Sequence, residues 1–581
     1  MLSILLSWFI IGVYAYLYGR TTICLLYGKK RLFLQTWDIY ITCGMIVLTV
    51  YAQFFSVFYK VGVVAFGVIS TGAVLCAAYL FHEKIWDDVR INNSKSLRLE
   101  RVILIVGIIG TLLWTNIIPQ HYDTGLYHAQ AIRWIEEYGV VPGLANLHFR
   151  FAYNSSFLPL QALFSFAWLS GRSLHTVNGF IVLCMQVYAV TSFRKRGGGM
   201  VQISDLLKLA MLAYFFYISM SVSSPNTDVP ALLLVFYVCM KWSEFAECRV
   251  ESVLPYSYLC ILCVYSVTIK LSVAVFGLLV IYPAIILVKS KQWRQIINHV
   301  VAGLIIVMPW LVRNVIISGY LVYPYPEIDL FRVDWKLAEQ TALADRREIV
   351  AWGRGNYDVS RYEDTLGEWF SEWFMGIHVL WQILFVIAAA TTVVLLLLII
   401  WDVLHDQNEL YSLLGIVCIG GVVFWLLSAP LPRYGIVYMA FLPCITMGRI
   451  LQNGSIKSWF EVKGYDRVDK AAKIFMSGFV VLYGLLFFSY SYMIPCGQKT
   501  LLIQNDYQNY DTIEGSLDGV IISRAAEGDQ TGYAPFPATP YSGVLESIEL
   551  RGNGLKEGFR RRERDVSITP RLTAGQDKLM K

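Results

Sequence analysis

Charged residues are scarce in this 581-residue chain, since Asp, Glu, Lys and Arg make up 15% of it and hydrophobic residues 56%. The mean hydropathy is +0.53. So little charge excludes an ordinary soluble globule and predicts a polytopic membrane protein surrounded by membrane lipids. The net charge of +6 is modest, and the basic residues stand in short clusters beside apolar runs. Because no single basic patch exists, we expect no nucleic-acid partner.

Two further absences concern processing and cross-linking. The apolar stretch from Met1 to Tyr18 lacks a preceding basic segment and a small-residue cleavage site, so we interpret it as a membrane helix and not a signal peptide. Of the eleven cysteines, only Cys496 lies in the C-terminal tail, which therefore has no disulfide framework. Cys260 and Cys263 lie within an apolar stretch and are interpreted as core thiols.

Apolar runs of membrane-spanning length are abundant. We expect about fourteen, beginning near Leu2, Thr36, Val61, Val102, Leu174, Asp205, Val229, Val253, Ser272, Ile297, Ile377, Leu410, Tyr434 and Ala471. The shorter run from Ser156 to Ser170 is expected to lie at the membrane interface. The basic clusters between runs then share one face, which is the cytoplasmic face by the positive-inside rule. The opposite, outer face carries the loops 119–173 and 319–376 and the tail.

The expected fold is therefore all-α and polytopic, in three parts. Residues 1–100 form N-terminal accessory helices, residues 101–494 form the transmembrane core, and residues 495–581 form an extracytoplasmic tail. Short apolar-rich runs in the tail, Gly519 to Ser523 and Ser547 to Arg551, predict a small α/β or β element. No internal repeat is visible, which counts against a secondary transporter.

The polar octapeptide HYDTGLYH (residues 121–128) follows directly on an apolar run. A carboxylate at the mouth of a membrane helix is costly to place, and Asp123 is therefore a candidate functional residue. Such a carboxylate suits a general base that deprotonates a hydroxyl, but a helix-capping or interfacial aspartate fits the local sequence equally well. His121 and His128 beside it also suggest a divalent metal, although their spacing matches no strong ligand pattern.

The first outer loop contains further polar residues and short helices. Ala129 to Tyr138 has the spacing of a short amphipathic helix, which Pro142 and Gly143 end. We expect this loop to consist of juxtamembrane helices that frame a connector.

Three cations are expected at outer ends of membrane helices. Lys270 lies in a stretch too long for one span, so that it stands at the junction of two helices; Arg313 closes a helix and Arg433 opens one. One acid and three cations at one boundary suit an anionic lipid head group, because one guanidinium group can donate two hydrogen bonds to phosphate oxygens. The alternative is that each cation only extends to the interface.

With these positions established, the pattern resembles the GT-C superfamily of integral-membrane glycosyltransferases, in particular its protein mannosyltransferase and aminoarabinose transferase branch. The matching features are Asp123 after the first core helix, Asn154 to Pro159, Ser224 to Pro230, Arg313-Asn314 and Gly319 to Pro324.

Longer strings resemble an uncharacterised group of large bacterial membrane proteins within that superfamily, over roughly residues 100–560. These strings are Tyr122 to His128, Tyr138 to His148, Gly319 to Pro324, Val333 to Lys336 and Ile548 to Gly552. Relatives in this group often carry cysteines where this chain has Tyr533 to Tyr541, and none is present here.

The resemblance implies a GT-C-like fold and an inverting glycosyltransferase that moves a sugar from a polyprenyl-phosphate donor to a hydroxyl of a glycan, lipid or protein. Asp123 would be the base, and Lys270, Arg313 and Arg433 would bind the donor phosphate. The residues expected to shape the acceptor pocket are His121, Tyr122, His128, Arg133, His148, Asn154, Asp228, Asn314 and Tyr323. No cofactor is required, although a divalent cation is compatible with the reaction.

The implied location is the bacterial cytoplasmic (inner) membrane, with the active site on its periplasmic or extracellular side. Two other classes remain open. A transporter or flippase of lipid-linked saccharides would place the same charges near the middle of the bilayer. An O-antigen ligase or polymerase would share the outer arginines but would not need an acidic first outer loop.

Overall fold

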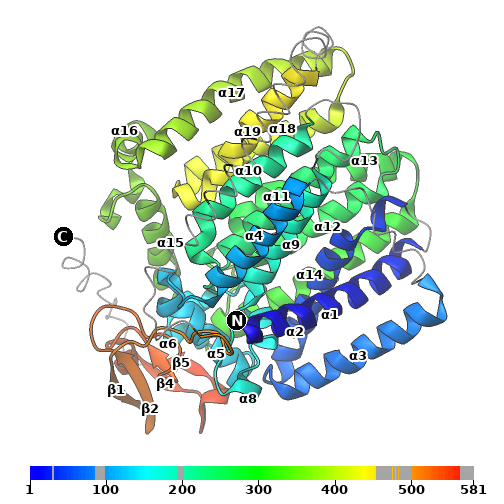
Figure 1. The fold of residues 1–581 in the computed structure, drawn as a ribbon. Coiled ribbons are helices and arrows are strands. Elements are labelled where there is room, and N and C mark those ends of the chain that lie inside the picture. Colours follow the sequence, from blue (N-terminus) through cyan, green and yellow to red (C-terminus); the bar gives the residue numbers. More distant parts are fainter. Residues whose placement is uncertain are drawn as a thin grey trace.

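The computed structural model describes residues 1–28, 32–85, 98–193, 202–452 and 500–562, with three isolated positions between 453 and 499. Within these ranges the chain forms a bundle of long helices, and a small β element lies against one end of the bundle (Figure 1). We call this end the site end. Helices α5, α6 and α8 and the N-terminus lie at the same end.

Ten helices of the described ranges are long and apolar enough to cross a membrane. They are α1 (Leu2–Tyr27), α2 (Trp37–Phe58), α3 (Val63–His82), α10 (Ile203–Ile218) with its 3-10 extension η5 (Ser219–Ser221), α11 (Asp228–Glu247), η6 (Leu271–Val280) continued by α13 (Ile281–Lys289), α14 (Trp293–Ser318), α17 (Val379–Leu404), α18 (Glu409–Ser428) and α19 (Pro432–Gln452). The chain is thus a polytopic helical protein, as the composition predicted.

The expected count of fourteen spans is not confirmed. Two of the expected runs form apolar helices of 16 residues, which are shorter than the roughly 20 residues that a bilayer requires: α9 (Val177–Ser192) and α12 (Leu254–Ile269). The run expected near Val102 forms α4 (Arg98–Asn116), which has 19 residues. The run expected near Ala471 lies outside the described residues. The expected junction at Lys270 is confirmed, because α12 ends at Ile269 and η6 begins at Leu271.

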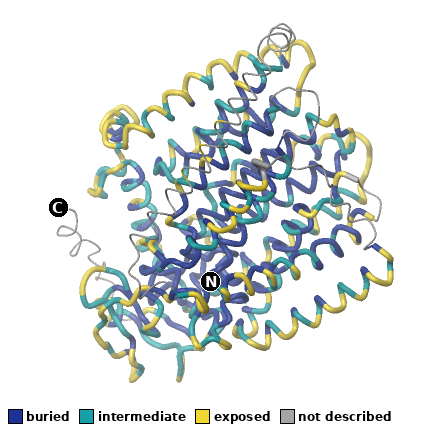
Figure 2. Tube along the Cα trace, in the orientation of Figure 1, coloured by how far each residue is buried: buried dark blue, intermediate teal, exposed yellow. Residues whose placement is uncertain are grey.

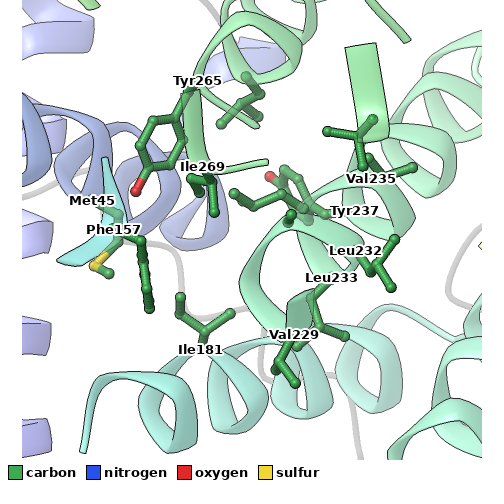
Figure 3. Packing of buried hydrophobic residues seen from close by; sticks show 14 of the residues in the cluster. Met45, Phe157, Ile181, Val229, Leu232, Leu233, Val235, Tyr237, Tyr265 and Ile269 are labelled. Atoms are coloured by element: carbon green, nitrogen blue, oxygen red, sulfur yellow. The ribbon is translucent and has the colours of Figure 1, made fainter. Parts of the chain in front are cut away.

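Helix α11 forms the centre of the bundle. Its side chains are buried along nearly its whole length, whereas α3 and α17 at opposite edges are mostly exposed (Figure 2). Because these two helices are strongly apolar, their exposed faces suit lipid. Figure 3 shows residues of α11, including Val229 and Leu233, packed beside residues of neighbouring helices such as Met45 and Ile181.

The N-terminal helices are packed into this same core. Helix α1 lies so close to α2 that a Cβ atom on Gly19 would lie 1.7 Å from the carbonyl oxygen of Tyr40. Helix α2 also contacts α7 (Phe157–Leu163), α12 and α14. The division of the chain at residue 100 stays a prediction.

The first loop after α4 is compact. The octapeptide contains a π-helical turn, η3 (Thr124–His128), which leads directly into α5 (Ala129–Glu137). The amphipathic helix predicted for this segment is therefore confirmed, and its Ile132 and Ile135 are buried. Short helices follow: α6 (Leu144–Leu147), η4 (Phe149–Ala152), α7 and α8 (Ala167–Ser170). The predicted interfacial run is thus split between α7 and α8.

The later outer loop contains α15 (Glu339–Gly353), η7 (Val359–Glu363) and α16 (Leu366–Gly376). A capping box at Thr365 and Glu368 fixes the start of α16. The carboxylate of Glu368 accepts hydrogen bonds from the backbone amide and the hydroxyl of Thr365. Helix α15 carries several residues of this loop that reach the candidate site, and Tyr323 and Tyr357 reach it from outside the helix.

The predicted β element of the tail is confirmed. Strands β1 (Thr512–Leu517) and β2 (Val520–Ala525) form an antiparallel hairpin, and β3 (Ala538–Thr539) pairs with β2 in parallel. The hairpin turns at Asp518 and Gly519, both with positive φ, as a two-residue turn on right-twisted strands requires. Strands β4 (Ile548–Leu550) and β5 (Phe559–Arg561) form a second, two-stranded sheet.

The C-terminal element, residues 500–562, is docked onto the first loop and the N-terminus. The amides of Thr531 and Gly532 both donate to the carbonyl of Gly125, each at 2.9 Å, and the amide of Phe559 donates to the carbonyl of Pro142 at 3.0 Å. The amide of Leu2 donates to Leu501. These bonds hold the element over the site end of the bundle.

Candidate functional site

A cavity of about 2070 Å³ lies between the ends of several membrane helices and the C-terminal element. One wall is built from the start of α11, the end of α12 with the start of η6, the end of α18 and the start of α19. The other walls come from η3 and η4, from α15, and from residues 524–529 and 540–547.

Asp123 lies at the junction of these walls, immediately before the π turn. Its carboxylate Oδ2 is 3.7 Å from Nη2 of Arg433 and 3.8 Å from Nδ1 of His121. The side chain is 20% exposed and lines the cavity. The backbone amide of His121 donates to Oγ of Ser224 at 3.0 Å, which ties the octapeptide to the loop before α11.

A second acid and a second cation stand beside this pair. Nε of Arg433 is 3.7 Å from Oδ2 of Asp228, and Lys270 contacts the other carboxylate oxygen of Asp228. The phenol of Tyr434 accepts a bond from Arg433 at 3.0 Å, and its ring lies 4.0 Å from Nζ of Lys270. Two acids and two cations therefore form one balanced cluster in the cavity wall.

The electrostatics of the cluster keep Asp123 ionised. Burial by itself would raise the pKa of this carboxyl, but His121 and Arg433 outweigh burial and lower the pKa to about 2. Burial lowers the pKa of His121 to about 4 and that of His128 to about 3. Both imidazoles are therefore neutral at pH 7, and the positive charge beside Asp123 comes from Arg433.

His128 is a buried side chain of this site whose hydrogen-bonding capacity is unsatisfied. It is 2% exposed and lines the cavity, and within the described part of the chain neither ring nitrogen has a hydrogen-bond partner. A buried polar group without a partner costs free energy, so a ligand with a hydroxyl or phosphate oxygen would satisfy it.

The structure places Arg313 away from the other predicted phosphate-binding cations. This arginine is 2% exposed, does not line the cavity, donates from Nε to Oδ1 of Asn154 at 3.0 Å and donates from Nη1 to Ser56. It connects α14 to α2 and to the loop before α7. Asn314, one residue further on, does line the cavity and donates to the carbonyl of Leu321.

The remaining predicted pocket residues divide in the same way. Tyr122, Asn154 and Tyr323 line the cavity. His148 is buried behind it among aromatic rings. Arg133 donates to the carbonyls of Tyr533 and Ala534 and so holds the C-terminal element in place. His121 contacts Asp123 from behind without lining the cavity.

The sequence reasoning missed several residues of the site. Arg150 of η4 lies 3.6 Å from Oε2 of Glu348 of α15, and both line the cavity. Asp345, one turn earlier, accepts hydrogen bonds from the phenols of Tyr153 and Tyr323. Burial raises the pKa of Asp345 and that of Glu348, the latter to about 7 despite Arg150. The sequence signal for these residues is the spacing of the acids Asp345 and Glu348 along α15.

Among the described residues, no group of three or more His, Cys, Asp or Glu side chains is placed to hold a metal ion. His121 and Asp123 lie together, but His128 contributes no third ligand in this arrangement.

The fold and the cavity define a class: a polytopic helical membrane protein with an ionic cluster at one end of its bundle. Residues 1–440 match the model of a protein family described as a domain of unknown function, DUF8201, and the chain belongs to this family. The matched range includes every residue of the ionic cluster but not the C-terminal element. Comparison with curated proteins gives no match, and comparison with solved structures gives none either.

Proposed function

We propose that the chain is an integral-membrane glycosyltransferase that moves a sugar from a polyprenyl-phosphate donor to a hydroxyl acceptor on the outer side of the membrane. One observation carries this proposal. Asp123, Asp228, Lys270 and Arg433 come from four elements far apart in the sequence, and they meet in the wall of one large cavity at the ends of apolar helices.

The step is a displacement at the anomeric carbon of the donor. The acceptor oxygen forms a bond to that carbon while the bond from the carbon to the phosphate oxygen breaks, and the configuration inverts. Asp123 takes the proton of the acceptor hydroxyl. Lipid phosphate is a weak base and leaves without protonation, so one base suffices, whereas glycoside hydrolysis needs two carboxyl groups.

The charges of the cluster match this step. In the donor the phosphate carries one negative charge, and after transfer it carries two. Asp123 loses its negative charge at the same time, because it becomes protonated. Arg433 is then released from Asp123 as the departing phosphate gains charge, so that the same cation stabilises both states. Placed donors that need no reorganisation are an effective form of transition-state stabilisation.

The side of the membrane is inferred from the opposite end of the bundle. Helices α11, α14 and α19 run between the site end and a remote end, and basic residues mark the latter: Arg249, Lys289, Lys291, Arg294 and Arg449. By the positive-inside rule the remote end faces the cytoplasm. The cavity would then face outward, where a lipid-linked sugar that has already crossed the membrane is available.

The test is transfer of a radiolabelled sugar from synthetic short-chain polyprenyl-phosphate sugars by the full chain in proteoliposomes. We expect Asp123→Asn to lower the transfer rate by about 10²- to 10⁴-fold, the usual contribution of a positioned base, with unchanged expression and insertion. Asp329→Asn is the matched control and should leave the transfer rate unchanged, because Asp329 is 52% exposed and does not line the cavity.

Transfer by Asp123→Asn at the wild-type rate would remove the base assignment. Movement of the intact lipid-linked saccharide across the bilayer, without transfer, would support the transporter class instead.

A further inference from the structure

The cavity is too large for a donor head group alone. Ligand pockets typically measure ~300–1,000 Å³, and this cavity of about 2070 Å³ is roughly twice the upper value. The ionic cluster occupies one wall, formed by membrane helices. A second wall is formed by η4, α15 and the C-terminal element, none of which is a candidate membrane span. The second wall has its own chemistry.

Two cations of the second wall are paired with acids. Arg150 is 3.6 Å from Glu348, and Nη1 of Arg346 donates to Oε1 of Glu327 at 2.7 Å. Asp345 is covered by two phenol groups. Because Arg150 and Arg346 already have acids, this part of the wall is less suited to a strongly ionic ligand. It offers polar edges to a neutral, hydroxyl-rich molecule.

Aromatic rings stand beside these polar groups. Trp352, Tyr357 and Tyr541 all line the cavity. The guanidinium of Arg150 lies 5.4 Å from the ring centre of Trp352, and Tyr541 stacks on Phe149 with nearly parallel planes. Rings flanked by a carboxylate and a guanidinium suit a sugar, whose C–H faces pack on aromatic surface while its hydroxyls bind the polar edges.

Asp123 lines the same cavity as the second wall. It is 3.7 Å from Arg433, and Arg150 and Glu348 line the cavity with both of them. One cavity can therefore hold a phosphate at Arg433 and a second molecule at Arg150 and Glu348, with Asp123 exposed to both. An inverting displacement needs two such molecules in one site, since the acceptor must approach the anomeric carbon opposite to the leaving phosphate.

We propose that Arg150, Glu348, Trp352 and Tyr541 form an acceptor subsite for a neutral saccharide, so that the chain extends a glycan and does not modify a protein or a lipid base. The subsite binds saccharide whether or not transfer follows. That the bound saccharide is the acceptor rests on the proposed function. Glu348 and Arg150 bind hydroxyls of the terminal sugar, Trp352 packs against its face, and one remaining hydroxyl points to Asp123.

The experiment measures saccharide binding apart from transfer. The full chain is placed in lipid nanodiscs, which avoids glycoside detergents, and is applied to an array of neutral hexose and pentose oligosaccharides. Dissociation constants for the bound glycans are then measured by tryptophan fluorescence. We expect Trp352→Ala and Glu348→Gln to raise the dissociation constant about tenfold or more, and Trp352→Phe to restore part of the affinity.

Two further variants protect the result from effects on folding. Tyr357→Ala changes a ring that is 64% exposed in the cavity wall, and we expect a smaller loss of affinity with unchanged stability. Trp401→Ala removes a tryptophan that is 59% exposed on α17, outside the cavity, and we expect unchanged affinity.

The outcomes separate this inference from the proposed function. Glycan binding that depends on Trp352 and Glu348, in a chain that transfers no sugar, would keep the subsite and contradict the transferase. Absence of glycan binding, or binding unchanged in Trp352→Ala and Glu348→Gln, would overturn the subsite even if transfer to another acceptor were observed.

Discussion

At the scale of single residues, the protonation of Asp123 is the property that most constrains the proposed chemistry. A carboxyl with a pKa near 2 is ionised but is a weak base. The weakness results from His121, 3.8 Å away, and Arg433, 3.7 Å away, which lower the pKa. A donor phosphate that takes over Arg433 would remove this partner and add a negative neighbour, and both changes raise the pKa of Asp123. Donor binding would thus convert Asp123 into a stronger base.

A pH profile tests this coupling. Because Asp123 in the free enzyme is ionised well below neutral pH, we expect kcat/KM for the donor, at saturating acceptor, to show no acidic decline from this group down to about pH 4. In the donor complex the raised pKa should give kcat an acidic limb at higher pH. If kcat/KM and kcat both declined in acid with the same pKa, the coupling would be contradicted.

Substitutions of Arg433 and Arg313, both predicted from the sequence to bind the donor phosphate, are expected to have different effects. Arg433→Ala should weaken binding of a short-chain polyprenyl phosphate about tenfold or more, because Arg433 lies in the cavity with its side chain 36% exposed. Arg313→Ala should chiefly lower thermal stability, since it removes the donor to the buried Oδ1 of Asn154 and the bond to Oγ of Ser56. Equal losses of phosphate affinity in both variants, at unchanged stability, would refute this distinction.

At the scale of elements, the docked C-terminal element forms part of the cavity wall. Gly558 has φ +94° and ψ −166°, a region used almost only by glycine, and a Cβ atom there would lie 2.0 Å from the carbonyl oxygen of Pro142. We expect Gly558→Ala to cost about 1–3 kcal/mol locally and to expose the element to limited proteolysis. Gly554→Ala is the control in the same segment, because its Cβ atom would meet open space. Equal protease resistance of the two variants would show that this contact does not hold the element.

Prediction from the sequence succeeded where apolar spacing or a shared membrane boundary indicated the structure. The helix at α5 follows from its apolar spacing, and the small β element of the tail follows from apolar-rich runs such as Gly519 to Ser523. The meeting of Asp123 with Arg433 followed from placing both at one membrane boundary. The pairing of Arg313 with Asn154 and Ser56 could not be foreseen, because Ser56 lies 257 positions away in the chain.

At the scale of the whole molecule, orientation in the membrane is decisive. Cys248, which follows α11 at the remote end, is the exposed cysteine of the described ranges. We expect it to react with a membrane-permeant maleimide in intact cells but not with an impermeant one, because the proposed orientation places the remote end in the cytoplasm. Glu527→Cys, in the cavity wall of the C-terminal element, should react with both. The reverse pattern would place the cavity in the cytoplasm and exclude an outward-facing transferase.

The most direct measurement is a structure of the chain with a short-chain polyprenyl-phosphate sugar, determined in Asp123→Asn to prevent turnover. We predict the phosphate in hydrogen-bond contact with both Arg433 and Lys270, with the prenyl chain along the apolar ends of α18 and α19 and the anomeric carbon directed to residue 123. A phosphate bound at any other place in the described bundle, with Arg433 and Lys270 still paired to Asp228, would contradict the account.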